Sequence, residues 1–128
     1  MLREKGFKTA FTTHFEIDPK NGAVQKHVAL GRFAHECCTL FQLKDKRVVA
    51  YSGDDSNDQH LYKFVSSKPN SLKEGTLYVA DTNNGKWIAL DWANQPLLKK
   101  AFENQTEVLI RAREAAKLLG ATELNRPE

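Results

Sequence analysis

The stretch GTLYVADTNNGKWIALDW, residues 75–92, contains the clearest structural signal in the sequence. Alternating apolar and polar residues lie on both sides of the polar run Asn83, Asn84 and Gly85. Asn-Gly pairs favour the tight turns, with positive φ angles, that connect two antiparallel strands. The stretch therefore predicts a β-hairpin.

The same plan of short strand, polar turn and short strand repeats upstream of this hairpin. HFEIDPKNGAVQKHVAL (residues 14–30) has Pro19 and an Asn-Gly pair at its centre, and TLFQLKDKRVVAYSG (residues 39–53) has a charged turn. HLYKFVSSKPN (residues 60–70) adds another strand-like run. Strands in series over about residues 12–93 predict a mainly β fold, a sandwich or a propeller, more than a parallel sheet with crossover helices.

The pattern changes to a helical period after Pro96. Within about residues 97–119, Leu97 to Phe102 suggest a first helical turn or two, and apolar residues then recur at helical spacing over residues 105–119. Asn104 can cap this second part, and Glu107 three positions later completes a capping-box sequence. Gly120 stands where a helix commonly ends in a left-handed residue. We therefore expect one helix near the C-terminus.

Composition and charge limit the classes of function. The 128 residues suffice for one modest domain, and 41% hydrophobic with 27% charged residues is typical of a globular chain. The net charge of +3 comes from 19 basic and 16 acidic residues without a basic stripe, so we expect no nucleic-acid partner. The apolar runs are too short to span a membrane, and MLREKGFKTAF at the start lacks the apolar segment of an export signal.

The two cysteines are adjacent in the sequence, at Cys37 and Cys38. This spacing matches neither a zinc site nor a disulfide framework. We expect two free thiols that fill small buried positions.

An acidic cluster in GDDSNDQHLYKF, residues 53–64, is a candidate cation site. Asp54, Asp55 and Asp58 repel one another, and a bound cation would relieve that repulsion. The stretch is not an EF-hand loop, because Gln59 stands in place of the required glycine and Val65 in place of the bidentate glutamate. A hydrated acidic turn is an equally good interpretation.

Two shorter motifs could also carry chemistry. In GRFAHECC, residues 31–38, His35 and Glu36 offer a cation two ligands, although a surface turn with a salt bridge fits as well. In the terminal RPE, Arg126 suits a phosphate group and Glu128 a metal ion, although a charged chain end is common.

Taken together, these motifs resemble the PhoX-type alkaline phosphatases. Four motifs occur in the order and approximate spacing of that family, from about Phe15 to Glu128. They are LGRFAHE, then GDDSNDQHLYKF, then LKEGTLYVA followed by GKWIAL, and then RAREAAKLLGATELNRPE. The resemblance implies a six-bladed β-propeller and an exported bacterial enzyme that hydrolyses phosphate monoesters at an iron and calcium centre.

The resemblance also implies roles for individual residues. Glu36 corresponds to a metal ligand, Asp54 or Asp55 to a calcium ligand, Arg126 to a phosphate-binding arginine and Glu128 to a metal ligand. The family usually has small residues at the positions of the two cysteines, so no ligand role is transferred to them.

We therefore expect residues 1–128 to form a single partial domain, about two propeller blades with one inserted helix, from a periplasmic or secreted parent protein. Such a fragment would be inactive alone, bind calcium and iron weakly and associate with itself through exposed strand edges. A small, non-enzymatic β-rich binding module is the alternative.

Overall fold

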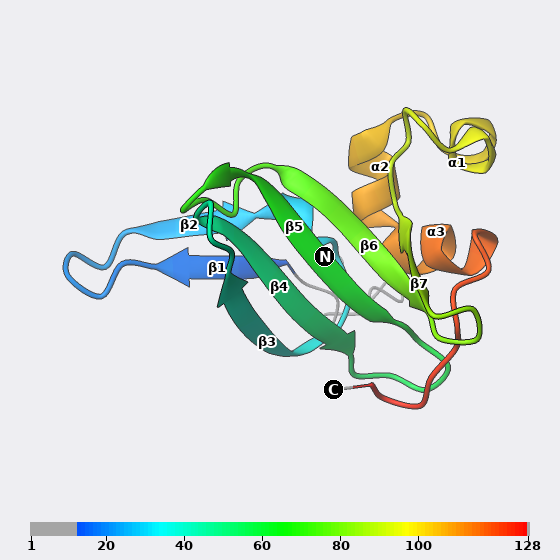
Figure 1. Cartoon of the computed structure of the whole chain (residues 1–128), viewed down its shortest axis with the longest axis horizontal. Coiled ribbons are helices and arrows are strands. Elements are labelled where there is room, and N and C mark those ends of the chain that lie inside the picture. The colour runs from blue at the N-terminus through cyan, green and yellow to red at the C-terminus, as the bar shows by residue number, and fades with distance from the viewer. Residues whose placement is uncertain (1–12, 128) are drawn as a thin grey trace, which may run out of the picture.

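The computed structural model describes residues 13–127, and these residues form two antiparallel sheets and three short α-helices. The strands and helices, including one 3₁₀ turn (Val28–Leu30), are arranged as Figure 1 shows: β1 (His14–Ile17), β2 (Val24–His27), β3 (His35–Gln42), β4 (Arg47–Asp54), β5 (Leu61–Pro69), β6 (Gly75–Asp81), β7 (Lys86–Ala89), α1 (Pro96–Ala101), α2 (Gln105–Ile110) and α3 (Ala112–Leu118). The expectation of a mainly β fold is confirmed.

Each strand of the larger sheet pairs with its neighbour in the sequence. The strand order is β3-β4-β5-β6-β7, and β1 pairs with β2 in a separate two-stranded sheet. The predicted turn at Asn83–Gly85 connects β6 to β7, and Gly85 adopts the positive φ of +63° that such a turn requires. The hairpin predicted within residues 14–30 is also formed, with Ile17 opposite Val24.

One face of the larger sheet packs against the helices and forms the core. Tyr62 and Phe64 of β5 and Leu77 and Val79 of β6 are almost fully buried, because alternate residues of each strand point to this face. They belong to a buried cluster that includes Val108 of α2 and three alanines of α3, Ala112, Ala115 and Ala116. In Figure 1 the helices lie to one side, beyond β6 and β7.

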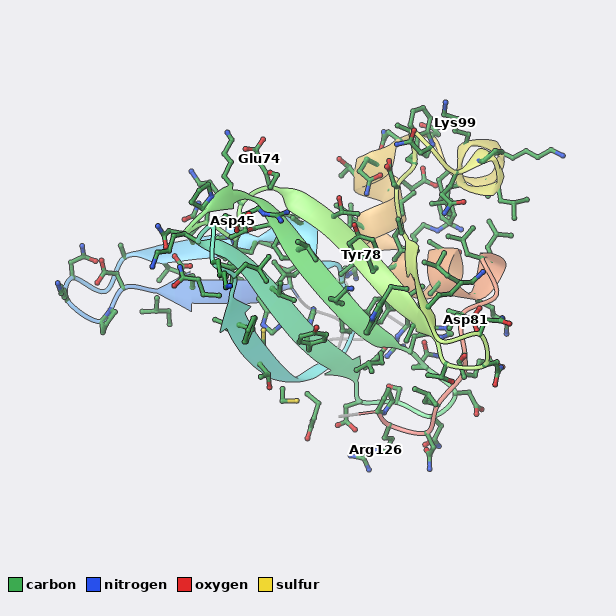
Figure 2. The ribbon with its side chains drawn as sticks, in the orientation of Figure 1. Asp45, Glu74, Tyr78, Asp81, Lys99 and Arg126 are labelled. Carbon is green, nitrogen blue, oxygen red and sulfur yellow. The ribbon has the colours of Figure 1, made fainter. Side chains whose placement is uncertain are left out.

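The opposite face of the sheet carries a row of large side chains. Tyr51, Lys63 and Tyr78 are paired across β4, β5 and β6, and the Lys63 ammonium lies 4.7 Å from the centre of the Trp87 ring and 5.1 Å from that of Tyr78. Figure 2 shows Tyr78 on the face of the sheet turned toward the viewer. We call Tyr51, Lys63, Tyr78 and Trp87 the aromatic row.

The helical region differs from the single helix expected over residues 97–119. The chain leaves helical geometry at Phe102 (φ −129°, ψ 151°), whose carbonyl accepts a hydrogen bond from Trp92 Nε1. A second irregularity at Arg111 (φ −107°, ψ 42°) separates α2 from α3. None of the helices in residues 13–127 is long and apolar enough to cross a membrane.

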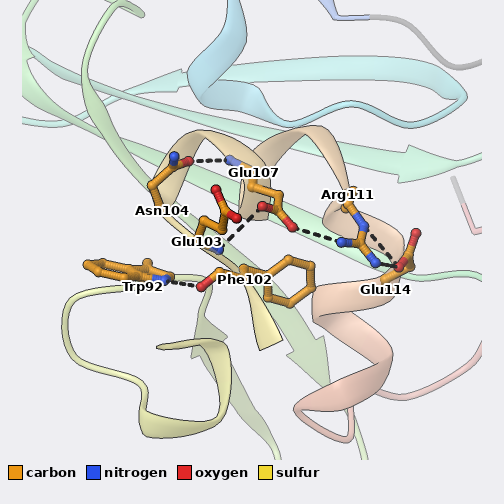
Figure 3. Close-up of polar contacts among 7 residues, drawn as sticks. All are labelled: Trp92, Phe102, Glu103, Asn104, Glu107, Arg111 and Glu114. Atoms are coloured by element: carbon orange, nitrogen blue, oxygen red, sulfur yellow. Dashed lines mark hydrogen bonds and ion pairs between the residues drawn. The ribbon is translucent and has the colours of Figure 1, made fainter. Parts of the chain in front are cut away.

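The predicted N-cap of α2 is present. Asn104 Oδ1 accepts a hydrogen bond of 2.9 Å from the Glu107 amide, as Figure 3 shows. The Glu107 carboxylate accepts from the amide of Glu103 at 3.3 Å, one residue before the position of a standard capping box. Gly120 follows α3 with a φ of +78°, as expected for a helix end.

The prediction for the cysteines is half right. Both Cys37 and Cys38 are free thiols, but both are exposed instead of buried. They lie on β3, which is an edge strand of the larger sheet, so only one of its sides is paired with another strand. Burial of part of the Cys38 side chain, followed by the nearby Cys37, raises the pKa of the Cys38 thiol.

Candidate functional site

A bulge at the start of β3 sets the position of Glu36. His35 pairs with Asp54 and Cys38 with Ser52, so β3 has two residues where β4 has one, and the register shifts between them. A bulge of this kind bends the strand and redirects a side chain. Glu36 is exposed at this bend.

The ring of His35, the neighbour of Glu36, is hydrogen-bonded at both nitrogens. Its Nε2 lies 3.1 Å from the Gly31 carbonyl oxygen and therefore carries the proton, and its Nδ1 accepts from the Ser52 hydroxyl at 2.9 Å. Burial, with a smaller contribution from His14, lowers the pKa of His35 to about 4, and the Gly31 carbonyl partly opposes this shift. Both ring nitrogens already have partners in the fold.

Asp54, the last residue of β4, is fully buried and paired with Arg113 of α3. Arg113 Nε donates to Asp54 Oδ2 at 2.7 Å, and Arg113 Nη2 donates to Asp54 Oδ1 at 2.6 Å. The same Nη2 donates to Ser56 Oγ at 2.9 Å. Both carboxylate oxygens of Asp54 are thus held in a bidentate ion pair.

Asp55 lies in a different environment from its neighbour. Its side chain is at the surface, where Arg126 Nε donates to Asp55 Oδ1, while its backbone amide donates to the Ala34 carbonyl at 2.8 Å. The hydrogen bond from Arg126 lowers the pKa of Asp55, and a hydrogen bond with the Glu36 carboxyl group lowers it further. Glu36 and Arg126 therefore both interact with Asp55, and we call these three residues the carboxylate–arginine cluster.

The C-terminal segment reaches this cluster by pairing with the loop after β4. Gln59 and Leu124 exchange two backbone hydrogen bonds, and the Arg126 amide donates to the Ser56 carbonyl at 3.1 Å. Figure 1 shows the segment passing the end of β4, and Figure 2 shows Arg126 at that edge of the molecule. Glu128, the other predicted residue of the terminal motif, lies outside the described residues.

The chemistry that this cluster can support follows from its groups. Two adjacent carboxyl groups repel when both are ionised, and a hard cation such as calcium or iron(III) relieves the repulsion, so Glu36 and Asp55 fit the implied metals. Arg126 is a permanent cation suited to an oxyanion. Within residues 13–127, no group of three or more histidine, cysteine, aspartate or glutamate side chains is arranged to hold a metal ion.

Sequence reasoning quoted the motifs that contain Arg113 and Ser56 but missed the contact of these residues with each other and with Asp54. Arg113 stands on a helix among alanines, and its pairing with Asp54 joins positions 59 residues apart, which no local pattern indicates. The available clue is that Arg113 lies beside Ala112 and at helical spacing from Ala116, which are apolar positions of the same helix.

At one end of the sheet of this mainly β protein, two carboxyl groups and an arginine lie together, and such groups suit metal ions and oxyanions. The family model described as "Alkaline phosphatase PhoX" matches residues 7–128. The chain belongs to the PhoX family of alkaline phosphatases.

A solved structure supports this assignment. It is Pseudomonas fluorescens PhoX in complex with vanadate, a transition state analogue, and it is 38% identical to this chain with a TM-score of 0.78. The match covers 89% of this chain and 24% of that structure's chain, so this chain spans about a quarter of its relative. No curated protein matches this chain.

Proposed function

We propose that this chain supplies part of the metal- and phosphate-binding centre of a metal-dependent phosphomonoesterase. The observation that carries the proposal is the carboxylate–arginine cluster, in which Arg126 contacts a carboxylate 71 positions earlier in the chain. All three members were expected from the family motifs. Their contact at one end of the sheet is what a shared site requires.

Each member of the cluster has a role in this proposal. Glu36 and Asp55 hold a calcium or iron ion, and Arg126, whose side chain is 61% exposed, turns from Asp55 to the oxygens of a bound phosphate ester. The bound metal, when present, supplies positive charge that activates a nucleophile and stabilises the leaving oxygen. We assign the metal to Asp55 instead of Asp54, because both oxygens of Asp54 are occupied by Arg113.

The site is completed, in our proposal, by a larger protein. The PhoX structure is about four times as long as the matched region, and a third metal ligand is not found among residues 13–127. The half-exposed aromatic row suits contact with a neighbouring sheet, as between blades of a propeller. We place the parent protein in the periplasm or outside the cell, and we expect the isolated chain to have no phosphatase activity.

Calcium titration of the purified chain, followed by amide NMR, tests the metal site. We expect saturable shifts at Glu36, Asp55 and Arg126 at millimolar calcium, and we expect Asp55→Asn to abolish them. Asp45→Asn is the matched control, because Asp45 is also a surface aspartate paired with an arginine, Arg47, at the opposite end of β4.

Inorganic phosphate added to the calcium-loaded chain tests the role of Arg126. Arg126→Gln should weaken the phosphate-dependent shifts, whereas Arg47→Gln should leave them unchanged. Absence of calcium shifts, or shifts that Asp55→Asn leaves intact, would contradict the proposal and favour a non-enzymatic binding module. Hydrolysis of a phosphate monoester by the isolated chain, above that of a Glu36→Ala variant, would contradict the expected inactivity.

A further inference from the structure

We propose that Arg113 is a positioning residue that fixes the backbone around Asp55 so that the carboxylate–arginine cluster is formed before any ligand binds. The inference rests on the proposed function of that cluster, but it concerns a residue on α3 that is not itself a member. Arg113 lies within the motif RAREAAKLLGATELNRPE, but the family resemblance assigns it no role, and its guanidinium group bonds to the two neighbours of Asp55.

Arg113 forms hydrogen bonds with the residues on both sides of Asp55. Its guanidinium group donates two hydrogen bonds to Asp54 and one to Ser56, at 2.6 to 2.9 Å. Asp54 and Ser56 are both held by α3, whereas the carboxylate of Asp55 accepts from Arg126 of the C-terminal segment.

The same short segment also holds the other two parts of the cluster. The Ala34 amide donates to Asp54 Oδ1 at 3.3 Å, and the Asp55 amide donates to the Ala34 carbonyl at 2.8 Å, two residues before Glu36. The Ser56 carbonyl accepts from the Arg126 amide at 3.1 Å. By fixing residues 54 and 56, Arg113 thus sets the distance between the segments that carry Glu36 and Arg126.

Orientation, more than stability, is what this ion pair supplies. The desolvation cost of a buried pair offsets much of its Coulombic gain, so apolar packing could replace it without loss of stability. A planar guanidinium with donors directed at two residues instead fixes an angle, and lysine, with a single ammonium group, cannot reproduce that fork.

The test is amide hydrogen exchange of the purified chain, with Arg113→Lys as the first variant. We expect exchange at the Asp55 and Arg126 amides to become about tenfold faster, while the amides of Val65 and Val79 in the central strands keep their protection. Arg111→Lys is the matched control, because Arg111 precedes α3 and forms exposed ion pairs with Glu107 and Glu114.

A second variant distinguishes a local effect on this segment from general unfolding of the chain. Asp54→Asn combined with Arg113→Gln removes both charges together, so no unpaired charge is left in the core, and it should give the same local acceleration. A uniform loss of protection across the sheet in both variants, or unchanged exchange at Asp55 and Arg126, would overturn the proposal.

Calcium binding, measured without phosphate, provides the functional readout. If the unsubstituted chain shows saturable calcium shifts, Arg113→Lys should weaken its calcium affinity about tenfold while the strand amides stay protected from exchange. Unchanged calcium affinity would overturn the proposal. If the parent chain binds no calcium, the proposed function fails, whereas the exchange result at Asp55 and Arg126 still decides whether Arg113 positions this segment.

Discussion

Asp54 and Asp55 show how neighbouring residues of one type can have unlike roles. Asp54, the last residue of β4, is buried against Arg113, whereas Asp55, the first residue beyond the strand, is partly exposed beside Arg126. A buried carboxylate depends on its partner, because an unpaired charge in the interior is costly. A surface ion pair contributes much less to stability.

We therefore predict that Asp54→Ala lowers the free energy of unfolding by about 3 to 5 kcal/mol, because it leaves Arg113 without its main partner in a largely buried position. Asp55→Ala should cause a much smaller loss. Urea unfolding of both variants and of the surface control Asp45→Ala measures the difference. Equal losses for Asp54→Ala and Asp55→Ala would contradict the assigned environments.

A second prediction concerns pH and His35. The folded pKa of about 4 lies below the unfolded value near 6.5, so the folded state binds fewer protons and its stability is complete above pH 6.5. Stability should fall as the pH drops from 6.5 toward 4, by about 2 kcal/mol between pH 7.5 and 5. His14, whose pKa is also lowered by burial and by His27, acts in the same direction.

Urea unfolding across this pH range checks the prediction. His35→Gln should retain part of the pH dependence, from His14, and lose the larger part. A slope as steep as that of the parent chain would show that His35 is not responsible.

The candidate residues could be found from the sequence because short motifs carry them, but their contacts could not. The sequence left open which of Asp54 and Asp55 is paired inside the fold, since the partner of Asp54, Arg113, lies 59 positions away. The cysteines were misplaced for a related reason. Their burial depends on whether β3 is an edge strand, which the pairing of the whole sheet decides.

At the scale of elements, the helices depend on contacts beyond their own sequence. Each has six or seven residues, too few for an isolated helix to be stable in water. Gln105, at the start of α2, accepts from the Trp92 amide at 2.7 Å and donates to the Leu90 carbonyl at 2.9 Å. The segment after β7 is thus attached to α2 by side-chain hydrogen bonds.

We predict that Asn104→Ala lowers the free energy of unfolding by about 1 kcal/mol, because the Glu107 amide loses its cap. Thermal unfolding with Asn83→Ala as the control measures this effect. Asn83 lies in the exposed turn between β6 and β7, and its substitution should change stability by less than about 0.5 kcal/mol. The prediction fails if the two variants have the same melting temperature.

Elements that are set locally could be predicted, and those set by tertiary contacts could not. The turn residues at Asn21–Gly22 and Asn83–Gly85 determine where two hairpins reverse, so these were found from the sequence. The single expected helix was wrong because Trp92 draws the Phe102 carbonyl away from helical geometry and Arg111 interrupts the remainder.

At the scale of the whole molecule, β3 is an edge strand of the larger sheet that carries exposed apolar side chains. Leu40 is 56% exposed and Phe41 is 60% exposed on this strand. Unpaired backbone groups beside exposed apolar side chains favour pairing with another strand.

We predict that the isolated chain associates with itself at high concentration and that Phe41→Lys reduces this association, because a charge on an edge strand opposes strand pairing. Sedimentation velocity measures the effect. Ile110→Lys adds the same charge at an exposed apolar residue of α2 and should leave association unchanged. Equal effects of the two substitutions would point to general charge repulsion instead of the strand edge.

The order of the strands also has a consequence for how the chain folds. In β3-β4-β5-β6-β7 every pair is formed by strands that are consecutive in the sequence, so each pairing closes a short loop of chain. Low contact order of this kind favours rapid folding, because little loop entropy is lost before each contact forms. The contact between Arg113 and Asp54 closes a far longer loop, so we expect the candidate site to be among the last parts of the molecule to assemble.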